Sequence, residues 1–222
     1  MTTVFLQEKH CYVCGAGSRY PEIGSGFSNA GTKDLDTRPS QVQRSSVYMW
    51  IQRCLSCGYC APDISRGSEG IGEMVYSDEY RRQLIDRAYP ETANSYLCRS
   101  MIMEKAGETA DAGRAILFAA WVCDDNGYKE KARECRRRAA AIIEKVGKRG
   151  ERCTHDKETD AVLMVDLLRR AGDFDRAAQL CKEELSKEHT EETVALLEFE
   201  EDLIEDRDAS CHATSEAHED IE

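Results

Sequence analysis

Two short cysteine motifs constrain this 222-residue chain more than any other feature. The first is Cys11-Tyr-Val-Cys14-Gly15 and the second is Cys54-Leu-Ser-Cys57-Gly58. Two thiolates three residues apart on a tight turn can bind one metal ion, and the following glycine permits the backbone conformation that such a turn needs. Two turns together supply four sulfur ligands, which is the closed tetrahedral set of structural zinc sites. The sequence therefore predicts a structural Zn²⁺ bound by Cys11, Cys14, Cys54 and Cys57.

The distance between the two motifs is unusual. Thirty-nine residues separate Cys14 from Cys54, whereas simple zinc ribbons use about 15–20. Doubling a loop costs only about 0.6 kcal/mol of closure free energy, while structural zinc supplies about 10–16 kcal/mol in small peptides. The metal site therefore tolerates the long loop, and we expect the N-terminal part to depend on the metal for folding.

The remaining cysteines leave alternatives open. Cys60 extends the second motif to a CxxCxxC run, which can also hold an iron–sulfur cluster. Because Cys11 and Cys14 already complete a set of four, we interpret Cys60 as an additional thiol. We expect Cys98, Cys123, Cys135 and Cys181 to lie within helices, mostly on apolar faces, where cysteine packs as a small hydrophobic residue. Two further groups are expected to be solvated, with a second metal site as the less favoured reading: Cys153 with His155 in a loop, and Cys211, His212 and His218 in the tail.

A change of pattern after residue 76 predicts a helical region. Apolar residues recur with helical periodicity, and Gly107, Gly127 and Gly172 are each followed five residues later by alanine. Such turns favour antiparallel helical hairpins, either a degenerate tetratricopeptide-like array, which Leu168–Ala177 approaches, or an ordinary helical bundle. Before this region, residues 47–51 predict a strand and residues 65–72 a loop. The expected helices cover residues 77–89, 91–106, 109–124, 128–146, 157–171, 174–187 and, less distinctly, 190–206.

The sequence thus predicts an α+β fold that is mostly α. A small zinc-ribbon β domain is expected over residues 1–75, tetratricopeptide-like antiparallel helical hairpins over 76–206, and an acidic disordered tail over 207–222. The net charge of −12 is concentrated at the C-terminal end, where residues 183–222 contain 16 acidic and two basic residues. This acidity argues against broad nucleic-acid binding. The basic stretch Lys129–Arg152 is an exception, which we interpret as a solvated helix face.

The segments Leu35-Asp-Thr-Arg-Pro39 and Trp50-Ile-Gln-Arg-Cys-Leu-Ser-Cys-Gly-Tyr-Cys-Ala61 carry a family resemblance. The chain resembles a prokaryotic family of uncharacterised proteins, a domain of unknown function with a CxxC motif, an Asp-x-Asp-x-Arg-Pro-like loop, a CPxCGY motif and tetratricopeptide-like helices. The resemblance is strongest over residues 11–65, with Leu55 in place of the usual proline. It implies the same four zinc ligands and no established activity.

The loop Asp34–Pro39 is the one segment outside the cysteines where the sequence suggests further chemistry. In an extended segment Asp34 and Asp36 share a face. They could hold a cation, or Asp36 could pair with Arg38. The alternative is a loop whose carboxylates cap turns and anchor the long insertion.

These features predict a zinc-binding protein whose helical scaffold binds a protein partner. Two alternatives remain: a nucleic-acid-associated zinc ribbon, and an enzyme that uses a metal or the Cys60 thiol. The nucleic-acid alternative requires Arg136–Arg138 to share one face with Arg19, Arg38, Arg44 and Arg53. We identify no catalytic residues and expect no membrane span, because no run approaches about 18 apolar residues. The odd number of cysteines, eleven, and the absence of an apolar signal-peptide core favour the cytoplasm. The oligomeric state is left open.

Overall fold

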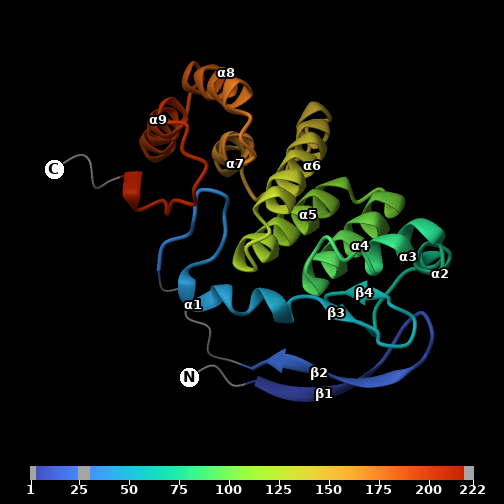
Figure 1. Cartoon of the computed structure of the whole chain (residues 1–222). Helices are drawn as coiled ribbons and strands as arrows, with labels where there is room; N and C mark the ends of the chain where they lie inside the picture. Colours follow the sequence, from blue (N-terminus) through green and yellow to red (C-terminus); the bar gives the residue numbers. More distant parts are fainter. Residues whose placement is uncertain (1–3, 25–30, 218–222) are drawn as a thin grey trace.

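The computed structural model of the chain describes residues 4–24 and 31–217. Helices dominate these ranges, and small antiparallel β-hairpins lie near the N-terminus (Figure 1). The fold is therefore α+β and mostly α, as the sequence predicts. Within the same ranges, no helix combines the length and the apolar character needed to cross a bilayer.

Two hairpins form the N-terminal part of the fold. Strand β1 (Val4–His10) pairs antiparallel with β2 (Gly17–Ile23), in a register that runs from Val4 opposite Ile23 to His10 opposite Gly17. Strand β3 (Gln52–Arg53) pairs with β4 (Cys60–Ala61) in the same sense. The sequence did not indicate the β1–β2 hairpin, because its residues do not alternate between apolar and polar.

The prediction of a strand over residues 47–51 is wrong. Val47–Met49 form a 3₁₀ turn, η1, and Val47 is fully buried. The hydroxyl of Tyr96 donates a hydrogen bond to the carbonyl oxygen of Val47 at 2.6 Å. The β-branched and aromatic residues of this segment therefore reflect burial against the helices, since tertiary packing decides where such residues form strands.

The helices agree closely with the periodicity of the sequence. Gly107, Gly127 and Gly172 each have φ near +80°, and the alanines five residues later are buried at the helix contacts. The first expected helix is shorter than predicted and ends at Leu84, and the expected loop over 65–72 gives way to a short helix at Ile71. The helices are α1 (Gln41–Arg44), α2 (Ile71–Val75), α3 (Asp78–Leu84), α4 (Glu91–Ala106), α5 (Thr109–Asp125), α6 (Lys129–Lys148), α7 (Lys157–Arg170), α8 (Phe174–Leu185) and α9 (Glu191–Glu205).

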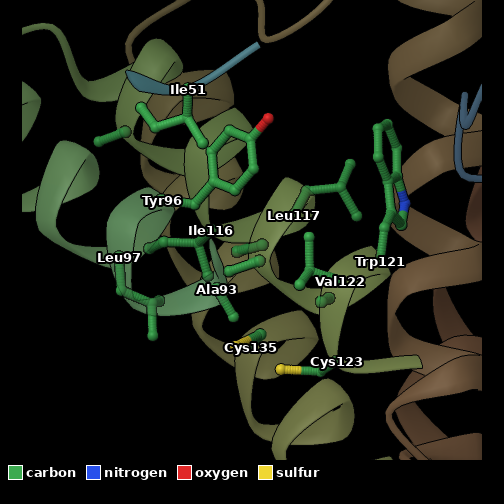
Figure 2. Close-up of a cluster of buried hydrophobic side chains, with 14 of the residues drawn as sticks. Ile51, Ala93, Tyr96, Leu97, Ile116, Leu117, Trp121, Val122, Cys123 and Cys135 are labelled. Atoms are coloured by element: carbon green, nitrogen blue, oxygen red, sulfur yellow. The ribbon is translucent and has the colours of Figure 1, made fainter. Parts of the chain in front are cut away.

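One buried apolar cluster runs from the hairpins through the helices (Figure 2). Ile51, just before the second cysteine motif, lies next to Tyr96 of α4, and Leu117 and Trp121 of α5 continue the cluster toward α7. The two parts of the chain therefore share a core. The domain boundary near residue 75 remains a prediction of the sequence.

The C-terminal segment, residues 207–217, differs from the expected disordered tail. Ala213 forms a β-bridge with Asp34, and the backbone N–H of Thr214 donates to the carbonyl of Lys33 at 2.8 Å. This segment lies beside the inter-knuckle loop, which we define as residues 31–50, below α7 and α9 in Figure 1. The acidic composition did not reveal these contacts, because they are made mainly by the backbone. The end of the expected tail, residues 218–222 with His218, lies outside the described residues.

Candidate metal centre

Each CxxC motif forms the turn of one hairpin. The backbone N–H of Gly15 donates to the carbonyl of Cys11 at 2.8 Å, and the N–H of Gly58 donates to the carbonyl of Cys54 at 2.8 Å. The two glycines have φ of +71° and +76°. The two turns therefore share one backbone conformation, which only glycine adopts without strain at that position.

The four cysteine sulfurs converge between the two turns. The Sγ atoms of Cys11 and Cys57 are 3.6 Å apart, as are those of Cys14 and Cys54, and all four lie within 4.8 Å of one another. Zinc–sulfur bonds of about 2.3 Å in a tetrahedron require sulfur–sulfur distances of about 3.8 Å. The spacing therefore fits a four-coordinate metal ion such as Zn²⁺. Cys60 is not a member of this group.

The surroundings of the thiols also fit a bound cation. Cys11, Cys54 and Cys57 are almost fully buried, whereas Cys14 is exposed. Burial raises the pKa of Cys11 and of Cys57, while a hydrogen bond from the backbone N–H of Ala16 lowers the pKa of Cys14 to about 7. A bound dication favours the thiolate form of every ligand, so it offsets the burial cost at the inner sulfurs.

Helix α3 holds the second turn in place. The hydroxyl of Tyr80, which is fully buried, donates to the carbonyl of Gly58 at 3.0 Å and accepts from the backbone N–H of Cys60 at 3.1 Å. Leu84 packs so closely that a Cβ added at Gly58 would lie 2.3 Å from its Cδ2 atom. The sequence did not single out Tyr80, because a tyrosine on an apolar helix face is ordinarily a core residue.

Cys60 is fully buried, and its Sγ donates to the carbonyl of Gly58 at 3.3 Å. Its other polar neighbours are Tyr80, Cys98 and Ser95. The enzyme alternative requires a pocket with a base next to Cys60, and these neighbours provide neither an imidazole nor a carboxylate.

Most other cysteines lie as expected, with one correction. The four helical thiols are buried in the apolar core, as the sequence predicts: Cys98, Cys123, Cys135 and Cys181. The expectation that Cys153 is solvated is wrong. It is 1% exposed, and its Sγ donates to the carbonyl of Ala110 at 3.5 Å, because the loop before α7 folds over the start of α5. The side chain of His155 remains exposed.

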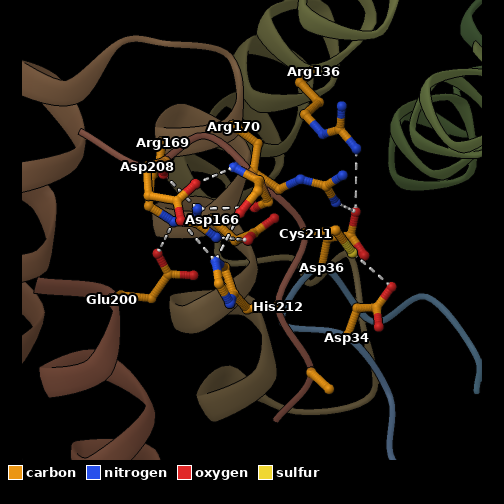
Figure 3. A network of polar contacts seen from close by, with 12 residues as sticks. Asp34, Asp36, Arg136, Asp166, Arg169, Arg170, Glu200, Asp208, Cys211 and His212 are labelled. Carbon is orange, nitrogen blue, oxygen red and sulfur yellow. Dashed lines mark hydrogen bonds and ion pairs between the residues drawn. The ribbon is translucent and has the colours of Figure 1, made fainter. Parts of the chain in front are cut away.

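The loop Asp34–Pro39 anchors the insertion to the helices through Asp36. The Asp36 side chain is fully buried and accepts hydrogen bonds from Trp121 Nε1 at 2.8 Å and from Arg170 Nη1 at 2.5 Å. Arg136 Nη2 lies 3.6 Å from the same carboxylate (Figure 3). Burial opposes ionisation, but Arg170 and Arg136 outweigh it and lower the pKa of Asp36. These contacts favour the anchoring interpretation over a cation site.

The ends of this loop are anchored separately. Asp34 accepts hydrogen bonds from Arg44 and, at 2.9 Å, from the Cys211 thiol. Arg38 does not pair through its side chain with Asp36; it donates to both carboxylate oxygens of Asp125 on α5, at 2.6 and 2.7 Å. Thr37 has φ of +68°, a conformation that costs energy for a β-branched residue.

The arginines proposed for nucleic-acid binding are largely committed to internal ion pairs. Arg136 is 2% exposed and pairs with Asp124 on α5 at 2.5 Å. The other engaged arginines are Arg38, Arg44 and Arg53, whose partners are Asp125, Asp34 and Glu91. The shared basic face required by that alternative is therefore not formed by these residues.

A cavity of about 760 Å³ opens between the inter-knuckle loop and the helices. Its apolar lining includes Trp50, Phe118 of α5, Val162 of α7 and Leu196 of α9. Phe118 contacts Trp50 edge-on, with ring centroids 5.6 Å apart. Volumes of about 300–1,000 Å³ are usual for ligand sites. Sequence reasoning missed this cavity, because its walls come from segments that are far apart along the chain.

The fold and the cysteine cluster together define a mostly helical α+β protein with a site suited to a metal ion. No family model, curated protein or solved structure matches the chain. The resemblance to the prokaryotic family of unknown function therefore remains a prediction that rests on the motifs between residues 11 and 65.

Proposed function

We propose that the chain is a zinc-binding protein whose metal ion holds the two N-terminal hairpins together as a zinc ribbon. The convergence of Cys11, Cys14, Cys54 and Cys57 within 4.8 Å carries this proposal. The matched turns support a closed structural site, because four protein ligands leave no coordination position for substrate. The eleven unpaired cysteines support a reducing compartment, the cytoplasm.

Metal content tests the site directly. Mass spectrometry of the purified full-length protein should find one zinc ion per chain, and the variant Cys54→Ser should lose it. Cys181→Ser is the matched control, because Cys181 is a buried thiol in α8 away from the cluster. Iron in place of zinc, or equal zinc content in the wild type and Cys54→Ser, would contradict the proposal.

We further propose that the helical part is a tetratricopeptide-like scaffold that binds a segment of a protein partner. Alternate helices α5, α7 and α9 all contribute lining residues to the 760 Å³ cavity. Repeat arrays of helical hairpins use such concave surfaces for binding. Because the lining is mainly apolar, the partner segment should insert an aliphatic or aromatic side chain.

A displayed peptide library tests this part. Peptides selected on the wild-type protein should bind at least tenfold more weakly to Leu196→Lys, which places a charge in the cavity wall, while Glu201→Lys on the exposed face of α9 should bind them normally. Selection of peptides that bind all three proteins equally would refute the proposed surface. This outcome would leave the zinc site unaffected.

A further inference from the structure

Two buried carboxyl groups, those of Asp166 and Glu200, share one arginine, Arg169. Arg169 Nη2 donates to Asp166 Oδ1 at 2.7 Å, and Arg169 Nε donates to Glu200 Oε2 at 2.6 Å (Figure 3). Asp166 lies on α7 and Glu200 on α9, and both are at most 1% exposed. The second oxygen of each group, Asp166 Oδ2 and Glu200 Oε1, is buried and has no hydrogen-bond partner among the described residues.

Unpaired buried oxygens of this kind are costly, because each loses its hydration without replacement. A proton placed between the two groups removes the cost, since the protonated carboxyl then donates to the other one. The two side chains are near enough for Asp166 to raise the pKa of Glu200.

The charge balance of the network points the same way. Within the part of the chain that the structure describes, the carboxylates of Asp36, Asp124, Asp166 and Glu200 face the three guanidinium groups of Arg136, Arg169 and Arg170. Four carboxylates, of which only that of Asp124 is partly exposed, face three cations, so one negative charge has no cation to balance it. One bound proton restores neutrality.

Among residues 4–24 and 31–217, no other charged group near the pair supplies the missing cation. Burial is the largest cause that raises the pKa of both acids, to about 8 for Glu200. The negative charge of Asp36 on the inter-knuckle loop also raises the pKa of Asp166, whereas the positive charges of Arg170 and Arg136 lower it. The remaining nearby groups are Cys181 on α8, Glu201 on α9, and Asp208, Cys211 and His212 on the C-terminal segment. His212 is held by two carboxylates of its own segment, Asp208 and Glu216.

Arg169 connects the acid pair to the C-terminal segment. Its Nη1 atom donates to the carbonyls of Asp208 and Ser210 at 2.7 and 3.0 Å. This segment in turn contacts the inter-knuckle loop, where the N–H of Leu35 donates to the carbonyl of His212 at 3.0 Å. A rearrangement of Arg169 would therefore also change the contact between the C-terminal segment and the inter-knuckle loop.

We propose that Asp166 and Glu200 hold one proton between them, and that its loss releases the C-terminal segment from Arg169 and from the inter-knuckle loop. Without the proton, two carboxylates compete for one guanidinium in a buried site. Repulsion between α7 and α9 then loosens the position of Arg169, and the two carbonyls that it holds are freed. The segment is a latch that is closed at neutral pH and opens as the solution becomes alkaline.

Limited trypsin digestion of the full-length protein tests the latch. Arg207 begins the segment, and cleavage after it reports the released state. The cleavage rate of the wild type should rise relative to Glu200→Gln as the pH approaches about 8, by up to tenfold per pH unit as expected for release of a single proton, and should level off above about pH 8. Glutamine is the informative replacement, because its amide can donate to Asp166 as the protonated acid does. Glu201→Gln, which removes a charge from the exposed neighbour, should behave as the wild type.

A second measurement keeps the proposal testable if Glu200→Gln does not fold. Carbon NMR of the glutamate and aspartate carboxyl groups should show one buried protonated carboxyl at pH 7 in the wild-type protein. Absence of that signal would overturn the shared proton. A wild-type cleavage rate that keeps a constant ratio to Glu200→Gln across the pH range would overturn the latch.

Discussion

Replacement of Asp36 by asparagine tests the inference that the inter-knuckle loop is anchored by a buried ion pair. The substitution keeps the size of the side chain and one acceptor oxygen, but removes the charge that faces Arg170 and Arg136. Breaking a buried pair in this way costs about 3–5 kcal/mol. Because asparagine keeps one oxygen that can accept a hydrogen bond from Trp121 or Arg170, the expected loss of stability lies near the lower end of this range. Since 1 kcal/mol corresponds to about 2–4 °C in a protein of this size, Tm should fall by about 6–12 °C.

Scanning calorimetry at fixed zinc concentration measures this change. Asp111→Asn is the control, because Asp111 and Arg114 form an exposed pair whose loss should cost less than about 1 kcal/mol. The zinc content of Asp36→Asn should equal that of the wild type, since the anchor is separate from the four cysteines. A loss of stability no larger than that of Asp111→Asn would refute the reasoning.

The pH dependence gives a second check on the same residue. The folded-state pKa of Asp36 is lowered, so its contribution to stability is present above the unfolded pKa and is lost as the pH falls through the folded value. Asp36→Asn lacks this contribution. The stability difference between the wild type and the variant should therefore shrink on acidification.

Three further predictions concern the metal site and the acid pair. Gly15→Ala should destabilise the protein by about 1–2 kcal/mol through backbone strain alone. Gly58→Ala should cost about 1 kcal/mol more, because the added Cβ meets Leu84. Equal losses of stability for the two variants in urea unfolding would contradict the packing argument. Tyr80→Phe should cost about 1–3 kcal/mol, because it removes the partner of a buried carbonyl and a buried N–H, and faster zinc transfer to a chelator would accompany it. The pKa of Glu200 is raised to about 8, so its contribution to stability is complete below the unfolded value and is lost as the pH rises to 8. The urea midpoint of the wild type should therefore fall relative to that of Glu200→Gln between about pH 5 and pH 8, and the difference should stay constant above pH 8.

Local patterns were sufficient to predict much of the fold. The cysteine pairs were recognisable because a CxxCG turn depends only on neighbouring residues. The helices from Glu91 onward were predicted nearly to their ends, because periodicity and terminal glycines such as Gly107 and Gly172 act within a few residues. Prediction failed where a segment takes its conformation from distant contacts. Val47–Met49 form a 3₁₀ turn that is held by Tyr96, although the composition of this segment is typical of a strand.

Burial of charge was the least predictable feature. Arg136 belongs to a basic run that composition assigns to a solvated face, yet it is buried beside Asp36 and Asp124. The acidic tail from residue 207 was expected to be disordered, but the carbonyls of Asp208 and Ser210 accept hydrogen bonds from Arg169. Glu200, in the expected acidic helix before it, is fully buried. Composition reports how many charges a segment has, whereas only the fold determines which of them find partners.

The sequence by itself determined the four candidate metal ligands and the helical hairpins, because both depend on spacings of a few residues. Only the tertiary structure decided the role of Asp36, whose partner Arg170 lies 134 residues away along the chain. The same holds for the cavity and for the acid pair on α7 and α9. These features arise where separate segments meet, and the free energy of a buried charge depends on the groups that surround it in space rather than on its neighbours in sequence.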